Sequence, residues 1–205
     1  MAHQLTQDWN ARFAAGDTPW EDEQPSDAMA ELLRRYVKRG SKVLDVGCGL
    51  GTNAIWMAAN GYIVQGVDIS EAAVAQAAVR AAQAGITLRF QQMDFLSPHQ
   101  WDSPFDTVVD RGCLHSLCSR DARASFGKRV AESLMPGGLW INISGSADNP
   151  DPPGERERQG YPRLSVADIV AASEGWFDVV EIRRCTYGTG TETGFLAFAS
   201  LLQKR

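Results

Sequence analysis

The sequence lacks any long hydrophobic run and any excess of positive charge. No apolar segment approaches the roughly 20 residues that a membrane-spanning helix needs. The first residues, 1–13, lack the basic and apolar regions of a signal peptide. The formal net charge of −5 argues against a protein that binds nucleic acid through a basic face. We therefore expect a cytoplasmic protein whose partners include neither a membrane nor a nucleic acid.

Cysteine and histidine are scarce, and their spacing is not that of a metal site. The four cysteines, Cys48, Cys113, Cys118 and Cys185, form no C-x-x-C pair, and none of the three histidines stands at zinc-site spacing from them. We expect reduced and mostly buried thiols, with no disulfide framework and no metal.

The composition is that of an ordinary globular protein. Hydrophobic residues make up 44% of the 205 residues and charged residues 22%, and no internal repeat is present. This length favours a single domain, residues 1–205, with a buried core. Residues 5–39 are helical in pattern and are interrupted at residues 16–27.

Strands and helices are predicted to alternate along the middle of the chain. Apolar runs predict strands at residues 42–47, 62–68, 86–94, 105–112 and 139–145. Helices are predicted at residues 52–61, 71–85, 121–134 and 165–175, with Ser70 as the N-cap of the second. Two last strand-like runs, residues 176–187 and 194–204, look like an antiparallel hairpin. The pattern predicts an α/β fold, a single doubly wound and mostly parallel seven-stranded sheet with a C-terminal antiparallel hairpin.

A glycine-rich turn follows the first predicted strand. In KVLDVGCGLG, residues 42–51, glycine falls at positions 47, 49 and 51. A turn of this kind, between a strand and a helix, lets backbone N–H groups approach a ligand closely. The dinucleotide fingerprint G-x-G-x-x-G needs its third glycine where Thr52 stands. The spacing therefore favours a ligand other than a pyrophosphate dinucleotide.

Acidic residues end the next two predicted strands. A carboxylate at Asp68 can accept hydrogen bonds from both hydroxyls of a ribose. Asp94, or the amide of Phe95, is placed to meet an adenine edge. The carboxyl ends of strands are where open α/β sheets bind their ligands.

These segments resemble the cofactor motifs of a known family. LDVGCGLG, Asp68 within GVDIS, and the segment MDF are similar to those of the class I S-adenosylmethionine-dependent methyltransferases, which have a Rossmann-like fold. The predicted order of strands and helices is similar over nearly the whole chain. The resemblance implies S-adenosylmethionine as the cofactor, and it implies contacts from Trp20, Asp45, Gly47, Cys48, Gly49, Gly51, Asp68, Ile69, Asp94, Phe95 and Asp110.

The resemblance also assigns roles within that set. It places the glycine loop under the methionine part of the cofactor and Asp68 on the ribose. Asp94 with Phe95 would border the adenine, and Asp45 would help orient the amino-acid end. Cys48 is expected to be a small space-filling residue.

Other segments resemble particular branches of the family. Residues 9–26 are similar to the N-terminal signature of the thiol/halide and thiopurine methyltransferases, and residues 105–117 to the thiopurine-type fourth strand. The C-terminal runs resemble tellurite-resistance methyltransferases. The resemblance implies that residues 1–40 fold over the cofactor site. It also implies that a loop at residues 146–163 lies on the substrate side, with Tyr161 and Arg163 as candidate substrate contacts.

Three residues near the end of the fourth predicted strand are candidate catalytic groups: Asp110, Arg111 and His115. Arg111 could bind an anionic substrate or lower its pKa. His115, with an ordinary pKa near 6.5, suits a general base. The alternative is an Asp110–Arg111 ion pair that only fixes the loop. A thiolate held about 3–3.5 Å from the methyl carbon would need no base at all.

Aromatic residues of the N-terminal segment are further candidates. Trp9, Phe13 and Trp20 could form a wall over the sulfonium, since aromatic faces attract cations. The alternative for Trp9 and Phe13 is a packing stripe on a helix. For Tyr161 and Arg163 the alternative is a solvated surface loop.

The sequence leaves three functions open. The first is a methyltransferase that acts on a small thiol or another soft nucleophile. The second is an N- or O-methyltransferase of a heterocyclic or phenolic metabolite, and the third is a non-catalytic cofactor-binding protein. In each case we expect a monomer or homodimer.

Overall fold

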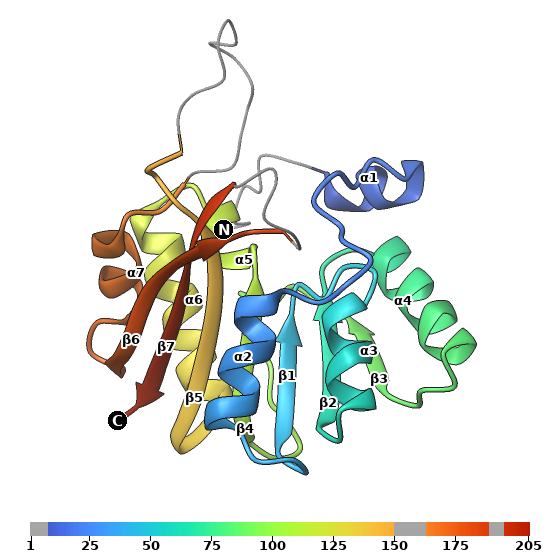
Figure 1. The fold of residues 1–205 in the computed structure, drawn as a ribbon, viewed down its shortest axis with the longest axis horizontal. Helices are drawn as coiled ribbons and strands as arrows, with labels where there is room; N and C mark the ends of the chain where they lie inside the picture. The colour runs from blue at the N-terminus through green and yellow to red at the C-terminus, as the bar shows by residue number, and fades with distance from the viewer. Residues whose placement is uncertain (1–7, 150–162, 189–194) are drawn as a thin grey trace, which may run out of the picture.

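The computed structural model describes residues 8–149, 163–188 and 195–205. Seven strands form one sheet in the order β3-β2-β1-β4-β5-β7-β6 (Figure 1). The strands are β1 (Lys42–Val46), β2 (Ile63–Asp68), β3 (Arg89–Gln92), β4 (Phe105–Arg111), β5 (Leu134–Gly145), β6 (Phe177–Thr186) and β7 (Leu196–Lys204). The first five pair in parallel, whereas β7 runs antiparallel to both β5 and β6. The predicted mostly parallel sheet with a C-terminal hairpin is confirmed.

Helices cover both faces of the sheet (Figure 1). They are α1 (Trp9–Ala15), α2 (Asp27–Tyr36), α3 (Thr52–Ala59), α4 (Glu71–Gln83), α5 (Cys113–Ser116), α6 (Arg120–Ser133) and α7 (Val166–Ser173). On one face α2 and α3 bury Leu33 and Met57 against the sheet. On the other face α6 and α7 bury Phe126 and Ile169. Two hydrophobic cores therefore hold the sheet between them.

Serine side chains define the start of several helices. Ser70 accepts a hydrogen bond from the backbone N–H of Ala73 at 3.1 Å, so the predicted N-cap of α4 is present. Ser26, Ser119 and Ser165 cap α2, α6 and α7 in the same way. Such caps satisfy backbone donors that the first turn leaves unpaired.

Three features differ from the predicted elements. Strand β3 ends at Gln92, so Asp94 does not end it: the Asp94 carboxylate accepts hydrogen bonds from Leu96 N and Ser97 Oγ, which begins a turn instead. Strand β5 starts earlier than predicted, at Leu134, and a register shift in its pairing with β4 accommodates the glycines that were expected to precede it. The short helix α5 was not predicted.

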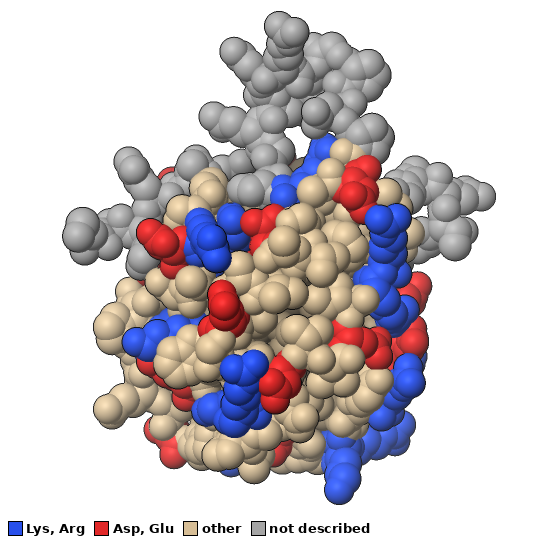
Figure 2. All heavy atoms as spheres, turned by 90° about the vertical axis from the view of Figure 1, so that its left-hand side faces the viewer, with Lys and Arg blue, Asp and Glu red and all other residues tan. Residues whose placement is uncertain are grey.

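The parallel strands bring the loops after β1, β2 and β4 to one edge of the sheet. Helix α1 and the chain that follows it lie above this edge (Figure 1). Within the described residues, no helix is long and apolar enough to cross a membrane. On the face that includes α7 and β6, acidic and basic side chains are interspersed among uncharged ones (Figure 2).

Candidate active site

The loop between β1 and α3 contains three glycines with left-handed backbone. Gly47, Gly49 and Gly51 have φ of +67°, +52° and +79°. L-residues with a Cβ avoid this region, which by itself favours glycine at each position.

Each glycine also faces a different neighbour. A Cβ at Gly47 would overlap the Sγ of Cys113, and one at Gly49 would overlap the Oε1 of Glu21. A Cβ at Gly51 would lie 2.9 Å from the Phe90 ring. The side chains of Cys113 and Phe90 therefore exclude a side chain at positions 47 and 51. Gly49 instead faces Glu21, which belongs to the segment that lies above the sheet edge.

Asp68, at the end of β2, holds the glycine loop. Its carboxylate accepts hydrogen bonds from Gly49 N and Ser70 N, both at 2.9 Å. Burial raises the pKa of Asp68, and these backbone hydrogen bonds oppose that rise. The carboxylate that is predicted to bind the ribose is thus already oriented by the backbone N–H groups of Gly49 and Ser70.

Asp45, on β1, is a strongly perturbed carboxyl beside the loop. It is 1% exposed, and its Oδ2 has no hydrogen-bond partner among the described residues. Burial raises its pKa to about 8, and the nearby carboxylates of Asp68, Glu21 and Asp110 add to the rise. Acidic groups crowded in this way favour a positively charged ligand.

S-adenosylmethionine fits this environment because it carries two positive groups, the sulfonium and the α-ammonium. The orphaned oxygen of Asp45 offers an acceptor to such a ligand, and the carboxylate of Asp68 suits hydroxyl groups. The residues present are therefore compatible with this cofactor.

The covering segment, residues 8–26, lies over the glycine loop. Asn10 of α1 docks on the start of α4, where its Oδ1 accepts hydrogen bonds from Ser70 Oγ and Ala72 N. Further along, Glu21 Oε1 accepts a hydrogen bond from Leu50 N at 3.4 Å. Thr52 Oγ1 donates to the backbone oxygen of Asp22. The segment is thus joined to both the loop and the neighbouring helix.

The three candidate aromatic residues of this segment form one cluster. Trp20 meets Trp9 and Phe13 edge-on, with ring centroids 5.4 and 5.9 Å apart. The guanidinium of Arg12 lies 4.2 Å from the Trp20 ring centroid. The side chain of Phe13 is buried. Packing accounts for much of this cluster, which also places an aromatic wall beside Gly49, 3.5 Å from a Cβ built there.

Arg111, which ends β4, is bound by the covering segment. Its guanidinium pairs with the carboxylate of Asp22 and donates to the backbone oxygens of Trp20 and Tyr187, both at 3.1 Å. It also stacks on the Tyr187 ring, 4.4 Å from the centroid. The alternative Asp110–Arg111 ion pair is wrong: adjacent residues of a strand point to opposite faces, and Arg111 pairs with Asp22 instead.

Asp110 lies inside the protein. It is 0% exposed, and its carboxylate accepts hydrogen bonds from Trp140 Nε1, Asn142 Nδ2 and Leu114 N. Burial raises its pKa to about 6. The structure therefore places Asp110 beneath the loops that follow β4 and β5, as a buried acceptor rather than an exposed base.

His115, on α5, is held as a neutral imidazole. Its Nδ1 accepts the backbone N–H of Gly145 at 2.8 Å, which leaves the ring proton on Nε2. Burial and the positive charge of Arg111 lower its pKa to about 4. The ring lies 5.3 Å from that of Tyr187, so it borders the same region as Arg111. A general base with these properties would be weak at neutral pH.

The remaining predicted residues are less closely grouped. Phe95 is buried and packs on Phe126, with ring centroids 5.2 Å apart. Ile69 follows Asp68 and is partly exposed, and Cys48 is buried, as expected of a space-filling residue. Arg163 lies over the Phe195 ring, 5.6 Å from its centroid. Tyr161 and most of the predicted loop 146–163 lie outside the described residues.

Sequence reasoning missed four residues of the site: Glu21, Asp22, Cys113 and Tyr187. The acidic run WEDE in the covering segment was a usable signal for the first two. No comparable signal marks Cys113 or Tyr187, because their proximity to the loop depends on the packing of distant segments.

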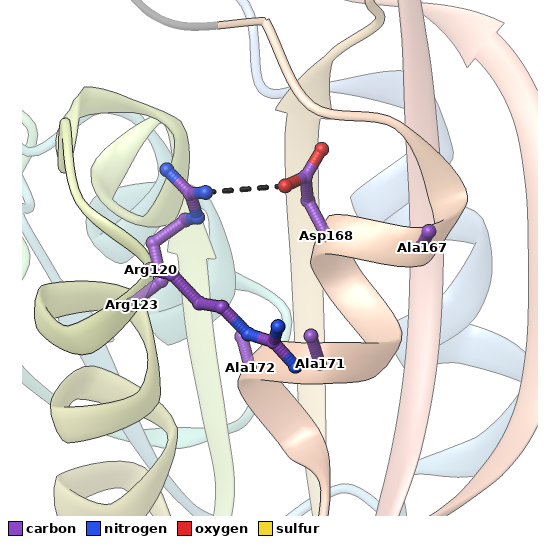
Figure 3. Close-up of a pocket in the computed structure, with 6 residues that line it drawn as sticks. All are labelled: Arg120, Arg123, Ala167, Asp168, Ala171 and Ala172. Carbon is purple, nitrogen blue, oxygen red and sulfur yellow. Dashed lines mark hydrogen bonds and ion pairs between the residues drawn. The ribbon is translucent and has the colours of Figure 1, made fainter.

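A separate hollow lies between α6 and α7 (Figure 3). Arg120, Arg123 and Asp168 line it with three alanines, and Arg123 Nη2 pairs with Asp168 Oδ1 at 3.1 Å. Arg123 also donates to the backbone oxygen of Leu117. Arg123 and Asp168 thus have structural partners, and the hollow is not part of the glycine-loop site.

Comparison with known proteins agrees with this geometry. Residues 43–138 match the family model of the methyltransferase domain. An uncharacterised methyltransferase of Schizosaccharomyces pombe is 39% identical over 89 residues, which cover 43% of this chain and 61% of that protein. The 2-heptyl-1-hydroxyquinolin-4(1H)-one methyltransferase of Mycobacteroides abscessus is 28% identical over 128 residues, covering 62% and 56%. The chain thus spans less than two thirds of the length of these relatives.

Solved structures share the fold at low identity. The 1,6-didemethyltoxoflavin-N1-methyltransferase of Burkholderia thailandensis, with bound 1,6-didemethyltoxoflavin and S-adenosylhomocysteine, superposes with a TM-score of 0.73 at 23% identity, covering 95% of this chain and 84% of that one. The N-methyltransferase NodS of Bradyrhizobium japonicum, in complex with S-adenosylhomocysteine, gives 0.73 at 20%, covering 95% of each chain.

Residues 43–138 thus resemble a methyltransferase domain, and the chain shares the fold of solved methyltransferases that bind S-adenosylhomocysteine. The likeness to the thiol, thiopurine and tellurite branches remains a prediction.

Proposed function

We propose that this protein transfers a methyl group from S-adenosylmethionine to a small molecule, a thiol or another soft nucleophile that reaches the site already ionised. The observation that carries the proposal is the convergence of Asp45, Asp68 and Glu21 on one glycine loop. These carboxylates suit a cofactor with two positive groups and a ribose.

The cofactor supplies an activated methyl group bound to a sulfonium. In this proposal Asp68 binds the ribose hydroxyls, and Asp45 with Gly47, Gly49 and Gly51 holds the amino-acid end. The covering segment excludes water, which strengthens the attraction between an anionic acceptor and the sulfonium.

The side chains at the end of β4 and on α5 favour a methyl acceptor that needs no general base. His115 presents a proton on Nε2, and Asp110 is occupied by three donors. Arg111 lies in the same region, and although it is paired with Asp22 its positive charge still acts on His115. An arginine beside the acceptor would stabilise a thiolate and lower the pKa of the thiol.

A methyl-acceptor screen tests the proposal. Purified protein is incubated with S-adenosylmethionine and thiols, halides, thiopurines, hydroxyquinolines or phenols, and released S-adenosylhomocysteine is measured. We expect turnover with thiols or other soft nucleophiles. Inert thiols together with turnover of a phenol or a ring nitrogen would overturn the choice of acceptor.

A second candidate is N- or O-methylation of a planar heterocycle. It is favoured by the likeness to the hydroxyquinolinone methyltransferase and by the aromatic side chains of His115, Tyr187 and Phe195 at the end of the sheet. The hydroxyquinolines of the same screen test it directly. Tight binding of S-adenosylhomocysteine without turnover of any acceptor would instead favour a non-catalytic cofactor-binding protein.

A further inference from the structure

Glu21 occupies an unusual place for a carboxylate. Its Oε1 lies directly over Gly49, where a Cβ would overlap it, and accepts the N–H of Leu50. The side chain is half-buried, and burial raises its pKa. It thus faces Gly49, where the edge of the Phe13 ring is the next nearest side chain that a Cβ would meet.

The residue after Glu21 is anchored independently. Asp22 pairs with Arg111, whose side chain is only 10% exposed. The Asp22 backbone oxygen accepts from Thr52 Oγ1, the first residue of α3. These contacts fix the backbone on the C-terminal side of Glu21, and the donation from Arg111 to Trp20 O fixes the other side.

We propose that Glu21 binds the α-ammonium group of S-adenosylmethionine, and that Asp22, through Arg111, is the positioning residue that holds Glu21 over Gly49. This inference rests on the proposed function, because it assigns a contact to the proposed cofactor.

The charge of the surroundings selects the ammonium rather than the carboxylate of the cofactor. The Asp68 carboxylate repels additional negative charge near Glu21. Of the nearby cations, Arg111 is paired with Asp22, and Arg80 is bound to Leu50 O and Thr52 Oγ1. An ammonium group between Glu21 and Asp45 would meet two acceptors, one of which has an unpartnered oxygen.

Calorimetry with two ligands tests the contact of Glu21. S-adenosylhomocysteine carries the ammonium group, and its deaminated analogue keeps the carboxylate but lacks that group. For Glu21→Gln we expect about 10- to 100-fold weaker binding of S-adenosylhomocysteine and nearly unchanged binding of the analogue. Glu23→Gln is the matched control, because Glu23 is an exposed acid of the same segment, and it should bind both ligands as the wild type does.

Two outcomes would overturn the role of Glu21. Equal losses for both ligands would mean that Glu21 only shapes the loop. Unchanged or tighter binding of S-adenosylhomocysteine would mean that the Glu21 side chain occupies the position of a ligand group and has to move away before the ligand binds. A wild-type protein that binds neither ligand would instead refute the proposed function.

Asp22→Asn tests the positioning role. We expect a higher KM for S-adenosylmethionine with a nearly unchanged kcat, and only a small further loss of affinity for S-adenosylhomocysteine when it is added to Glu21→Gln. Coupled residues behave in this way, whereas independent residues add. Fully additive losses, or a fall in kcat with KM unchanged, would refute the role of Asp22.

Discussion

Asp45 is a buried acid surrounded by other acids, and this single residue links the electrostatics of the site to the stability of the fold. Its folded-state pKa of about 8 lies well above the ordinary value of 3.8. Folding therefore takes up a proton in the pH range between these values. The free energy of unfolding should fall as the pH rises through this range.

The clearest window is pH 7.5 to 8. Asp110, with its pKa near 6, is largely ionised below it, and His115 has lost its proton in both states, because its pKa is near 4 in the folded protein and has the ordinary value of 6.5 in the unfolded chain. We expect wild-type stability to fall there by up to about 1.4 kcal/mol per pH unit. Asp45→Asn should flatten the slope, as measured by urea unfolding of the ligand-free protein at several pH values. Equal slopes in the two proteins would contradict the raised pKa.

His115 gives a second prediction at the residue scale. Since its pKa is about 4, the imidazole is neutral from about pH 5 upward and does not titrate near 6.5. With an acceptor that is ionised throughout, kcat should show no inflection near pH 6.5. His115→Gln should lower kcat by less than about tenfold, whereas loss of a true general base costs about 100-fold or more. A pH–rate profile of both proteins checks this, and a 100-fold loss would restore His115 as the base.

At the scale of elements, the loop between β1 and α3 shows how one short segment meets several constraints. Sequence reasoning correctly located the strand, the loop and the helix, because apolar periodicity and glycine spacing are local signals. It interpreted the glycines as room for a ligand. The structure adds that Gly47 makes room for Cys113 and Gly51 for Phe90, which come from distant segments. Contacts between distant segments cannot be predicted from a local sequence pattern.

Gly47→Ala tests that account. The backbone at φ +67° should cost about 1–2 kcal/mol for a residue with a Cβ, and overlap with the Cys113 Sγ should add to the loss. Replacing Cys113 with Ala in the Gly47→Ala protein should recover the stability lost through the overlap with the sulfur, but not the loss that comes from the backbone conformation. Denaturant unfolding of the two single variants and the double variant gives the coupling. Strictly additive losses would show that the sulfur is not the obstacle.

At the scale of the whole molecule, cofactor binding and folding should be coupled. A ligand that binds only the folded state adds about 2.7 kcal/mol of stability at 100 times its Kd. For a chain of this length that corresponds to a rise in Tm of roughly 5–10 °C. Differential scanning calorimetry with S-adenosylhomocysteine should show this shift, and a nicotinamide dinucleotide should give none. The reverse result would contradict the assigned cofactor.

The sequence predicted the overall fold better than it predicted the site. Alternating strands and helices define a parallel sheet, and the Asp68 and Gly49 contact follows from that topology. The partner of Arg111 did not follow, because Asp22 is far away in the sequence and reaches it only after the covering segment has folded back. Site residues that depend on long-range packing were therefore the ones predicted wrongly or missed.

The three-way contact of Arg111 has a consequence for biosynthesis. Its guanidinium joins Trp20 and Asp22 from the beginning of the chain to Tyr187 near the end. A ribosome-bound chain that has not yet emerged past Tyr187 cannot complete this junction, even when the glycine loop and its strands are already formed. Tight binding of the cofactor would then wait until the segment that contains Tyr187 has been synthesised.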